Sequence, residues 1–387
     1  YGQGGGWMAG AGSLCYLRAM PHAPADTAVP LAPADPAAYG LDGQRLAEAV
    51  RFAAAHETPW PRDLRAHLES GYFEPPPDNA ILGPVAPRGG PAGMILRRGA
   101  VVASWGDTAR ADMTFSVAKS YLSLLAGLAH GDGLIPDLDE PISARVRSPH
   151  FEGPRNGIVT WRQMLTLTSE WEGTLWGKSD VIDRNRDLKR EGNAKKGEAR
   201  PLRAPGTFWE YNDVRVNALS LALLHLFRRP LPEVFRARIM EPIGASRDWA
   251  WHAYETARVT IDGEEMPSVP GGGHWGGGVF IGAADQARIG LLVARRGRWD
   301  GRQLIAEPWF DAIAAPCALK PDYGLLWWLN TDGARAPAAS PRSLFASGAG
   351  GHVTWIDPER ELVSVTRWLD PEAFAGYAAR VVAAVRD

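Results

Sequence analysis

Cysteine is scarce in this sequence: Cys15 and Cys317 are the 2 cysteines among 387 residues, and neither belongs to a Cys-x-x-Cys pattern. So few and so widely separated cysteines argue against a disulfide framework and against a structural zinc site. Apolar runs are short as well, since even the run 122–129 closes at His130, far below the roughly 18 residues that span a bilayer. We therefore expect no membrane segment, and the paucity of cysteine favours a reducing compartment.

Charge of one sign is not in excess: 42 Lys and Arg stand against 44 Asp and Glu, which gives a formal net charge of -2. Without a basic stripe, nucleic acid is not the expected partner, and we expect a small molecule instead. Residues 1–12 lack a charged stretch followed by an apolar one, so they resemble an artificial linker more than a secretion signal. The sequence therefore favours a cytoplasmic location, and without a long heptad pattern it leaves the oligomeric state open.

The sequence lacks the motifs of α/β-hydrolases, nucleotide-binding proteins and zinc enzymes. No Gly-x-Ser-x-Gly elbow occurs, which removes the ordinary α/β-hydrolase serine. The run 271–276 satisfies Gly-x-Gly-x-x-Gly, but Pro270 precedes it and a β-prone run follows it, the reverse of the dinucleotide-binding order. The run 173–179 is one residue short of a phosphate-binding loop, and no His-Glu-x-x-His is present. We therefore expect no nucleotide, no metal and no organic cofactor.

The chain is long enough for one α/β unit with a second lobe. Two β-hairpins are predicted, one in 94–105 and one in 352–368, each split by a turn. Helical spacing of apolar residues predicts a helix near each end, at 42–55 and at 374–385, and the second should place one face on the sheet.

Between the hairpins the sequence is largely helical. The candidate helices are 116–130, 161–167, 213–228 and 231–239. We divide the chain into a linker and extended arm at 1–40, an α/β lobe formed by 41–110 and 256–387, and a mostly helical lobe at 111–255.

The most informative motif is Ser116-Val-Ala-Lys119 at the start of an apolar helix. A serine at a helix N-terminus lies among free N–H groups, and an amine three residues later lies one turn on, on the same face. Burial against apolar side chains lowers the proton affinity of such a lysine, so we expect Lys119 to be neutral and able to take the proton of Ser116. The blander interpretation is an N-cap serine followed by a solvated helix lysine.

Two further segments favour the catalytic interpretation because they follow in a fitting order. The turn 205–210 delivers Tyr211 just before a helix, where it can face the serine from the opposite side. The glycine-rich run 345–351 leads into the strand at 352–356, and bare N–H groups at such a sheet edge bind an oxyanion. Taken alone, Tyr211 is better explained as a core aromatic residue with a bonded hydroxyl.

With these three segments the chain resembles the class C β-lactamase-like serine hydrolases, a family that includes family VIII carboxylesterases, D-alanyl-D-alanine peptidases and 6-aminohexanoate-dimer hydrolase. The resemblance covers roughly 91–386. It implies an α/β (α+β) fold of the β-lactamase/transpeptidase type, in which an antiparallel sheet flanked by helices and a mostly helical lobe enclose the active site. It also implies that Ser116 attacks an acyl carbonyl, that Lys119 and Tyr211 share general-base and general-acid duty, and that the N–H groups of Ser116 and Ala349 hold the oxyanion.

The chain departs from the family pattern at two positions. Tyr211-Asn-Asp213 carries an aspartate where the lactamases have asparagine, although Asp213 also suits the N-cap of the next helix. Ala346-Ser347-Gly348 aligns with the third motif but lacks its cationic side chain, which in the family holds a substrate carboxylate. We therefore expect an uncharged or cationic ester or amide, with Asp213, Ser347 and Gly348 at the substrate, and less activity on β-lactams.

Three more residues are candidates for substrate binding. Trp171 and Trp176 lie close to the motifs in the sequence, and their amphipathic rings suit an acyl pocket as well as they suit a core. His274 is on a glycine-rich loop from which it could reach the cleft, although loop histidines are more often solvated.

The sequence thus predicts a hydrolase of a small carboxylic ester or linear amide that works through an acyl-Ser116 intermediate without a cofactor. An alternative within the same chemistry is a β-lactamase or D-alanyl-D-alanine peptidase. A third interpretation is a penicillin-recognising sensor that is acylated but does not turn over.

Overall fold

The computed structural model describes residues 33–188 and 195–386. At its centre is a six-stranded sheet in which every neighbouring pair of strands is antiparallel. In spatial order the strands are β12 (Trp328–Leu329), β13 (Leu344–Gly348), β14 (His352–Asp357), β15 (Leu362–Arg367), β1 (Ala92–Arg97) and β2 (Ala100–Trp105). Cys15, the linker at 1–12 and most of the predicted arm lie outside the described residues.

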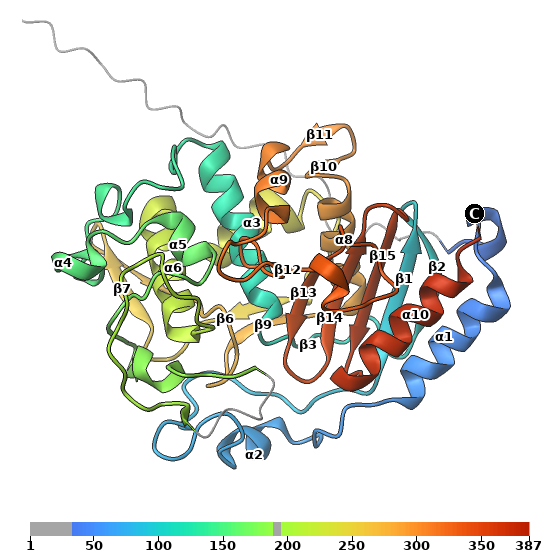
Figure 1. Ribbon diagram of the computed structural model, residues 1–387, viewed down its shortest axis with the longest axis horizontal. Coiled ribbons are helices and arrows are strands. Elements are labelled where there is room, and N and C mark those ends of the chain that lie inside the picture. The colour runs from blue at the N-terminus through green and yellow to red at the C-terminus, as the bar shows by residue number, and fades with distance from the viewer. Residues whose placement is uncertain (1–32, 189–194, 387) are drawn as a thin grey trace, which may run out of the picture.

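Both predicted hairpins are confirmed. Strands β1 and β2 form the first, and β14 and β15 form the second. The two hairpins join through β1 and β15, whose register pairs Ala92 with Arg367 and Arg97 with Leu362. Segments from opposite ends of the chain therefore lie side by side in the middle of the sheet (Figure 1).

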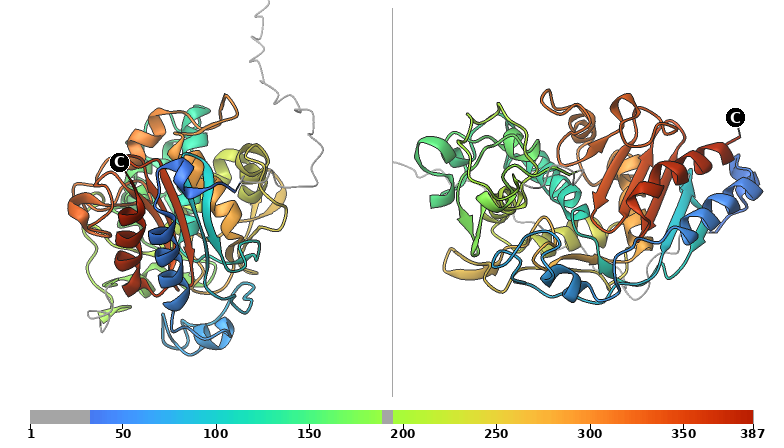
Figure 2. Two further views of the ribbon diagram at one scale, coloured as in Figure 1. Left: turned by 90° about the vertical axis from the view of Figure 1, so that its right-hand side faces the viewer. Right: turned by 60° about the horizontal axis from the view of Figure 1, so that its bottom comes forward.

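Helices cover both faces of this sheet because successive side chains on each strand point to opposite faces. On one face α10 (Phe374–Ala384) packs beside α1 (Gly43–Ala55), as the left view of Figure 2 shows. The ring of Phe374 lies 5.8 Å from that of Phe345 and 6.4 Å from that of Trp355, so the predicted packing of the C-terminal helix on the sheet is confirmed. On the other face lies α8 (Ala283–Ala294), where Gly290 lets the helix backbone approach β14 and β15 closely.

The helical lobe stands beside the sheet, and α3 (Val117–Gly131) runs between the two in Figure 1. All but its last two residues are buried, and it contacts β13 and β14 on one side and α6 on the other. The remaining helices are α2 (Leu64–Glu69), α4 (Gly153–Asn156), α5 (Trp161–Leu165), α6 (Asp213–Phe227), α7 (Leu231–Phe235) and α9 (Pro308–Ala314). The four helices predicted here are confirmed, although α7 is shorter because the chain continues as a π-helix over Arg236–Met240.

A second sheet contains the strand that comes directly before α3. Its strands are β3 (Asp112–Met113), β9 (Gly278–Ile281) and β6 (Ala250–His252), with β9 in the middle. Short hairpins complete the fold: β4 (Thr174–Leu175) with β5 (Lys178–Ser179), β7 (Arg258–Ile261) with β8 (Glu264–Pro267), and β10 (Arg298–Trp299) with β11 (Arg302–Gln303). Strand β3 pairs with β9 and is followed directly by α3, and Gly348 of β13 packs against Thr114. The residues between β3 and α3 therefore lie where the two sheets meet the helical lobe.

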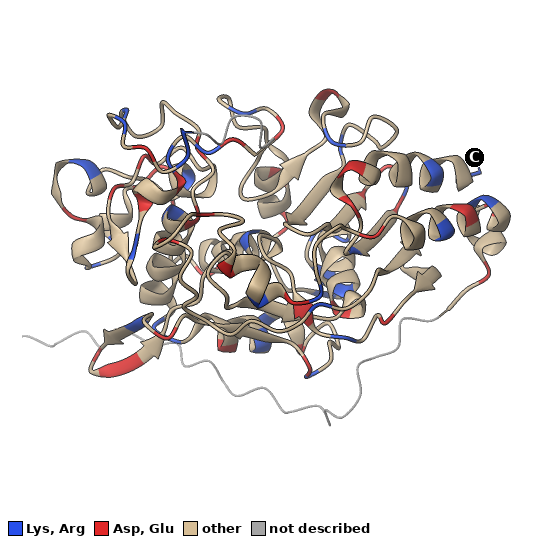
Figure 3. Ribbon diagram, turned by 90° about the horizontal axis from the view of Figure 1, so that it is seen from below, with Lys and Arg blue, Asp and Glu red and all other residues tan. Residues whose placement is uncertain are grey.

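Charged residues of both signs are interspersed along the chain in Figure 3, in keeping with the balanced composition. Across the described residues, no helix combines the length and the apolar character needed to cross a bilayer.

Candidate active site

Ser116 lies at the turn from β3 into α3. The residue before it, Phe115, has a positive φ of 49°, an uncommon conformation for a bulky residue that is found where neighbouring structure enforces it. Ser116 occupies the N-cap position, but its side chain accepts no capping hydrogen bond from the helix. Its Oγ lies 2.9 Å from the Nζ of Lys119, one helical turn on. The interpretation of Ser116 as a plain N-cap is therefore wrong, and its hydroxyl is turned toward the lysine.

Lys119 is enclosed, with only 1% of its surface exposed, so the interpretation as a solvated helix lysine is also wrong. Its Nζ forms an ion pair with the carboxylate of Asp213 and lies 4.7 Å from the ring centre of Tyr211. Burial lowers the pKa of Lys119, but the charge of Asp213, the neighbouring Tyr211 and the hydrogen bond to Asp213 together outweigh it, and the pKa is raised above the ordinary value of lysine. The expected neutral Lys119 is a misjudgement, because the sequence did not reveal its partner.

The sequence suggested that Asp213 is the N-cap of α6. In the structure Asp213 is the first residue of the helix instead. Asn212 is the cap, since its side chain accepts a hydrogen bond from the N–H of Arg215. The N–H of Asp213 donates instead to the carboxylate of Asp183 at 2.8 Å. Because Asn212 caps the helix, the carboxylate of Asp213 is free to form the ion pair with Lys119.

Both carboxylate oxygens of Asp213 are engaged. Oδ1 pairs with Lys119, while Oδ2 accepts a hydrogen bond of 2.9 Å from Arg186 and lies 3.1 Å from His274 Nε2. Burial raises the pKa of Asp213, but His274, Lys119 and Arg186 together lower it well below its ordinary value. Asp213 is therefore an anion whose contacts are with side chains of the protein, and its predicted contact with substrate stays a prediction.

His274 is buried, with 3% of its surface exposed, so the interpretation as a solvated loop histidine is wrong. Its ring stacks on Phe73 at 4.0 Å, its Nδ1 lies 3.2 Å from Glu74, and its Nε2 lies 3.0 Å from Arg186. Glu74 comes from a segment 200 residues earlier in the chain, and no sequence motif marked it.

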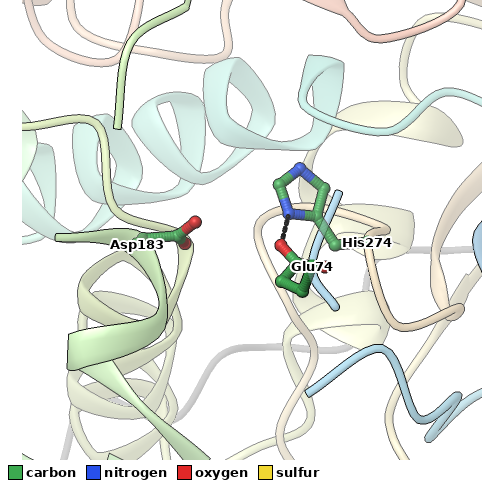
Figure 4. A group of neighbouring side chains, drawn as sticks. All are labelled: Glu74, Asp183 and His274. Carbon is green, nitrogen blue, oxygen red and sulfur yellow. Dashed lines mark hydrogen bonds and ion pairs between the residues drawn. The ribbon is translucent and has the colours of Figure 1, made fainter. Parts of the chain in front are cut away.

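Glu74, Asp183 and His274 form the group drawn in Figure 4, and their ligand atoms lie within 4.8 Å of one another. Carboxylates and imidazole are the residue types of many metal sites. Here the ammonium of Lys196 lies 2.7 Å from Glu74 and 3.2 Å from Asp183. A divalent ion at this point would have to displace that lysine, so the residues present do not fit a metal site.

The end of β13 lies directly against Ser116. A Cβ on Gly348 would lie 2.0 Å from the carbonyl oxygen of Thr114 and 3.2 Å from the nitrogen of Ser116, so only glycine fits there. Within residues 33–188 and 195–386, no acceptor binds the N–H of Ser116 or the N–H of Ala349. Both N–H groups are therefore available as hydrogen-bond donors, and their role as an oxyanion site stays a prediction.

The third motif has Ala346 in place of a cation, as the sequence shows, but Arg335 brings a cation beside it. Its Nη2 donates a hydrogen bond of 3.3 Å to the Oγ of Ser347, and its guanidinium lies 4.1 Å from the ring centre of Trp328. Burial lowers the pKa of Arg335 to about 10, and no carboxylate of the described residues pairs with it. The cation thus comes from a loop 12 residues before Ser347, outside the motif itself.

A pocket of about 320 Å³ opens beside this arginine. Its polar lining includes Arg335 and Ser347, Gly348 also lines it, and Leu369 and Phe374 are among its apolar walls, whereas Ser116 is not a lining residue. The pocket therefore offers an apolar surface with one cationic end, next to the strand that touches Ser116.

Tyr211 is buried in an aromatic group. Its ring stacks on Trp328 at 5.9 Å with an interplanar angle of 16°, and Trp209 lies 6.3 Å away. The guanidinium of Arg186 lies 5.1 Å from the ring centre of Tyr211, in addition to the lysine described above. The hydroxyl of Tyr211 makes no hydrogen bond with another described residue, so it is available to a substrate.

The two tryptophans predicted to bind substrate make other contacts in the structure. Trp171 belongs to the core and donates its indole N–H to the carbonyl of His150 at 2.7 Å. Trp176 is partly buried, and its ring lies 5.9 Å from that of Tyr254. Their place in an acyl pocket stays a prediction.

Comparison with known proteins gives one family and several structural neighbours. Residues 88–385 match the family model described as Beta-lactamase. No curated protein sequence matches the chain.

The structural neighbours are distant in sequence. EstCE1, a hydrolase with promiscuous acyltransferase activity, has a TM-score of 0.55 at 16% identity over 89% of this chain and 99% of its own. A beta-lactamase from Mycobacterium bovis has a TM-score of 0.52 at 18% identity over 76% of this chain and 94% of its own. A Bacillus anthracis protein provisionally named 6-aminohexanoate-dimer hydrolase has a TM-score of 0.54 at 17% identity, covering 75% and 78% of the two chains. At these identities the likeness establishes the fold alone.

Proposed function

This chain belongs to the beta-lactamase family, whose fold is that of serine hydrolases, and we propose that it hydrolyses a carboxylic ester or a linear amide through an acyl-enzyme on Ser116. The observation that carries the proposal is the 2.9 Å approach of Ser116 Oγ to Lys119 Nζ at the N-terminus of a buried helix. A serine in this setting accepts a hydrogen bond from the lysine amine and has free N–H groups beside it.

In the proposed reaction, the Oγ of Ser116 forms a bond to the acyl carbon while its proton passes to a general base. The tetrahedral oxyanion is held by the N–H groups of Ser116 and Ala349. Its collapse breaks the bond to the leaving group, which takes the proton from the base. Water then attacks the acyl carbon by the same route, the acid leaves, and the Ser116 hydroxyl is restored. Lys119 and Tyr211 are the side chains that serve these proton transfers.

The neighbours support the reaction class. The names of EstCE1 and of the Bacillus anthracis protein refer to hydrolysis, with acyl transfer as a side activity in EstCE1. Since an acyl-enzyme can react with an alcohol as well as with water, both activities agree with an acyl-Ser116 intermediate.

Intact-mass measurement during hydrolysis of a short-chain p-nitrophenyl ester tests the proposal directly. We expect a transient mass increase equal to the acyl group, and peptide mapping should locate it on the peptide that contains Ser116. Turnover with the acyl group on another residue, or turnover with no trapping of Ser116 by a fluorophosphonate, would contradict the proposal. A stable acyl mass without product release would favour a sensor over an enzyme.

A second candidate function is the hydrolysis of substrates that carry a carboxylate, such as a β-lactam or a D-alanyl peptide. The specific observation is Arg335, whose guanidinium lies at the pocket beside Ser347 without a carboxylate partner among the described residues. An unpaired guanidinium binds a carboxylate through charge-assisted hydrogen bonds. This candidate reverses the expectation of an uncharged or cationic substrate, which rested on the absence of a cation from the motif.

Arg335→Ala should lower kcat/KM for a carboxylate-bearing substrate far more than for a neutral one. Hydrogen bonds to charged groups contribute about 1.5–3 kcal/mol, which corresponds to roughly 10- to 100-fold. The measurement compares two p-nitrophenyl esters of equal length, one ending in a carboxylate and one in a methyl group, together with a chromogenic cephalosporin. If the variant loses activity equally on both esters, Arg335 supports the wall of the site and does not recognise the carboxylate.

A further inference from the structure

Residues 57–87 come before the region that matches the family model, which begins at residue 88. In Figure 1 this segment, which contains α2, runs along the lower edge of the molecule below β3. Its apolar side chains form a second hydrophobic core with residues of the family region: Trp60, Leu64 and Leu68 pack with Met113, Phe115, Phe280 and Trp368. A segment from outside the family region therefore packs against Phe115, the residue directly before Ser116.

The start of this segment is attached to the chain that follows β15. The N–H of Thr58 donates a hydrogen bond of 2.8 Å to the carbonyl of Trp368, and Glu57 forms an antiparallel bridge with Leu369. Backbone pairing of this kind extends the sheet by a short stretch and fixes the direction of the segment. Trp60 follows two residues after this attachment.

Trp60 is fixed at both its backbone and its ring. Its carbonyl accepts a hydrogen bond of 3.0 Å from Nε of Arg88, and its indole N–H donates to the hydroxyl of Tyr72 at 3.0 Å. Only 7% of its surface is exposed. A buried indole whose N–H has a partner is held in one orientation, so the ring of Trp60 is a rigid surface for its neighbours.

One neighbour of Trp60 is the turn that carries Ser116. The rings of Trp60 and Phe115 meet edge to face, with centres 5.4 Å apart and an interplanar angle of 89°. The positive φ of Phe115 persists only because surrounding structure enforces it, and this ring contact is part of that structure. The peptide plane after Phe115 contains the N–H of Ser116, so a contact that fixes Phe115 also fixes this donor.

The other neighbour is the glycine-rich turn after β13. A Cβ on Gly350 would lie 3.2 Å from Cε3 of Trp60 and 2.7 Å from Cζ3 of Trp368, so both indoles lie directly against the backbone of this turn. Ala349, the residue before Gly350, packs against the second core as well. Trp60 thus contacts the two turns that carry the N–H groups of Ser116 and Ala349.

We propose, on the basis of the function proposed above, that Trp60 is a positioning residue for both oxyanion donors. Its ring lies against the Ser116 turn and the Ala349 turn, which are far apart in the sequence, and sets their separation. Donors that are fixed before the reaction stabilise the charge that develops on the acyl oxygen without further rearrangement. The segment 57–87 therefore contributes to the chemical step although none of its residues needs to touch the substrate.

Trp60→Ala tests this role through the steady-state kinetics of a p-nitrophenyl ester. Loss of one oxyanion donor costs roughly 10²- to 10³-fold in kcat, so donors that are present but loosely held should cost about tenfold or more. Since the donors act on charge that exists only in the transition state, kcat and kcat/KM should fall together while KM stays within about twofold. A rise in KM at unchanged kcat would overturn the proposal.

A pair of ketone inhibitors of equal chain length gives a readout that general destabilisation does not move. A trifluoromethyl ketone accepts a bond from the Ser116 oxygen to its carbonyl carbon; the serine proton passes to the general base, and the carbonyl oxygen becomes an oxyanion. The matching methyl ketone binds with its carbonyl intact. We expect Trp60→Ala to raise the inhibition constant of the trifluoromethyl ketone about tenfold or more and that of the methyl ketone by less than about twofold. Equal changes for the two inhibitors would overturn the proposal.

Trp309→Ala is the matched control. Trp309 is also a buried tryptophan, with 1% of its surface exposed, and its ring lies against Gly127, about three turns after Ser116 in α3. Its loss should lower thermal stability as the loss of Trp60 does, yet leave the ratio of the two inhibition constants in place. If this control changes the ratio as much as Trp60→Ala does, the effect belongs to any large cavity beside α3, and Trp60 has no special role.

Trp60→Leu decides the question if Trp60→Ala does not fold. Leucine keeps the site apolar but lacks the ring that reaches Phe115 and Gly350. A selective loss of affinity for the trifluoromethyl ketone supports the role of Trp60, whereas affinities equal to those of the parent overturn it.

The two proposals fail in different ways. If the wild-type protein forms no acyl group on Ser116, the proposed function is wrong. If the acyl-Ser116 mass forms but the Trp60 variants keep the ratio of the two inhibition constants, only the role of Trp60 is wrong.

Discussion

Ser116→Ala should reduce ester hydrolysis on the order of 10⁴-fold or more, because the bond to the acyl carbon can no longer form on this residue. The acyl mass seen during turnover should vanish in the same variant. Its fold should persist, since the Ser116 side chain makes no capping hydrogen bond and its loss leaves Lys119 paired with Asp213. Steady-state rates and intact mass, measured on the same sample, check both results.

Ser123→Ala is the natural control for this experiment. Ser123 lies in the same helix, is fully buried, and its Oγ has no hydrogen-bond partner in the described part of the chain. Its removal should leave ester hydrolysis close to that of the parent. If Ser116→Ala is as active as Ser123→Ala, the acyl-enzyme mechanism proposed here is wrong.

Gly348→Ala should lower kcat by roughly 10²- to 10³-fold, the loss associated with a displaced oxyanion donor. The added methyl group would meet the carbonyl of Thr114 at 2.0 Å, so β13 must move away from the turn that holds Ser116. Overpacking of this kind also costs about 1–3 kcal/mol of stability. Kinetics and thermal unfolding of the purified variant, measured side by side, separate the two effects.

Gly43→Ala is a control for glycine replacement as such. Gly43 begins α1, has no neighbour within 4 Å of an added Cβ, and requires no left-handed backbone. Alanine there should leave activity unchanged and stability equal or slightly higher. If Gly348→Ala behaves in the same way, the close contact between β13 and the Ser116 turn has no part in catalysis.

The parts of the site that the sequence could predict are those set by local geometry. A serine and a lysine three residues apart on a helix must share a face, so the contact between Ser116 and Lys119 follows from their spacing. Alternation of side chains and turn residues likewise marked both hairpins of the sheet. These features depend on neighbours within a few positions in the chain.

The charge of Lys119 could not be predicted, because it is set by residues that only the fold brings together. Asp213 is 94 residues away, and the direction of its side chain depends on whether it or Asn212 caps α6. Both residue types suit an N-cap, so the sequence offered no means to choose between adjacent positions. The desolvation argument was sound in sign, but Asp213 and Tyr211 together outweigh burial and raise the pKa of Lys119.

Arg335 shows a different limit of sequence motifs. A motif specifies the residue type at one position in the sequence. A substrate, in contrast, contacts any side chain that lies in the binding site, whatever its position in the sequence. The cation near Ser347 comes from the loop between β12 and β13, so its absence from the aligned position carried no information about the charge of the pocket. A search for basic residues shortly before the strand would have raised this candidate.

The pairing of β1 with β15 also determines when the protein can become active during synthesis. The two strands are separated by more than 260 residues, and β13 comes shortly before β15 in the chain. On the ribosome the serine turn emerges long before β13, so a nascent chain leaves the edge of β1 unpaired until β15 has been made. A message truncated shortly before β13 would therefore yield a protein with Ser116 and Lys119 in place but no oxyanion edge, and with a strand open to aggregation.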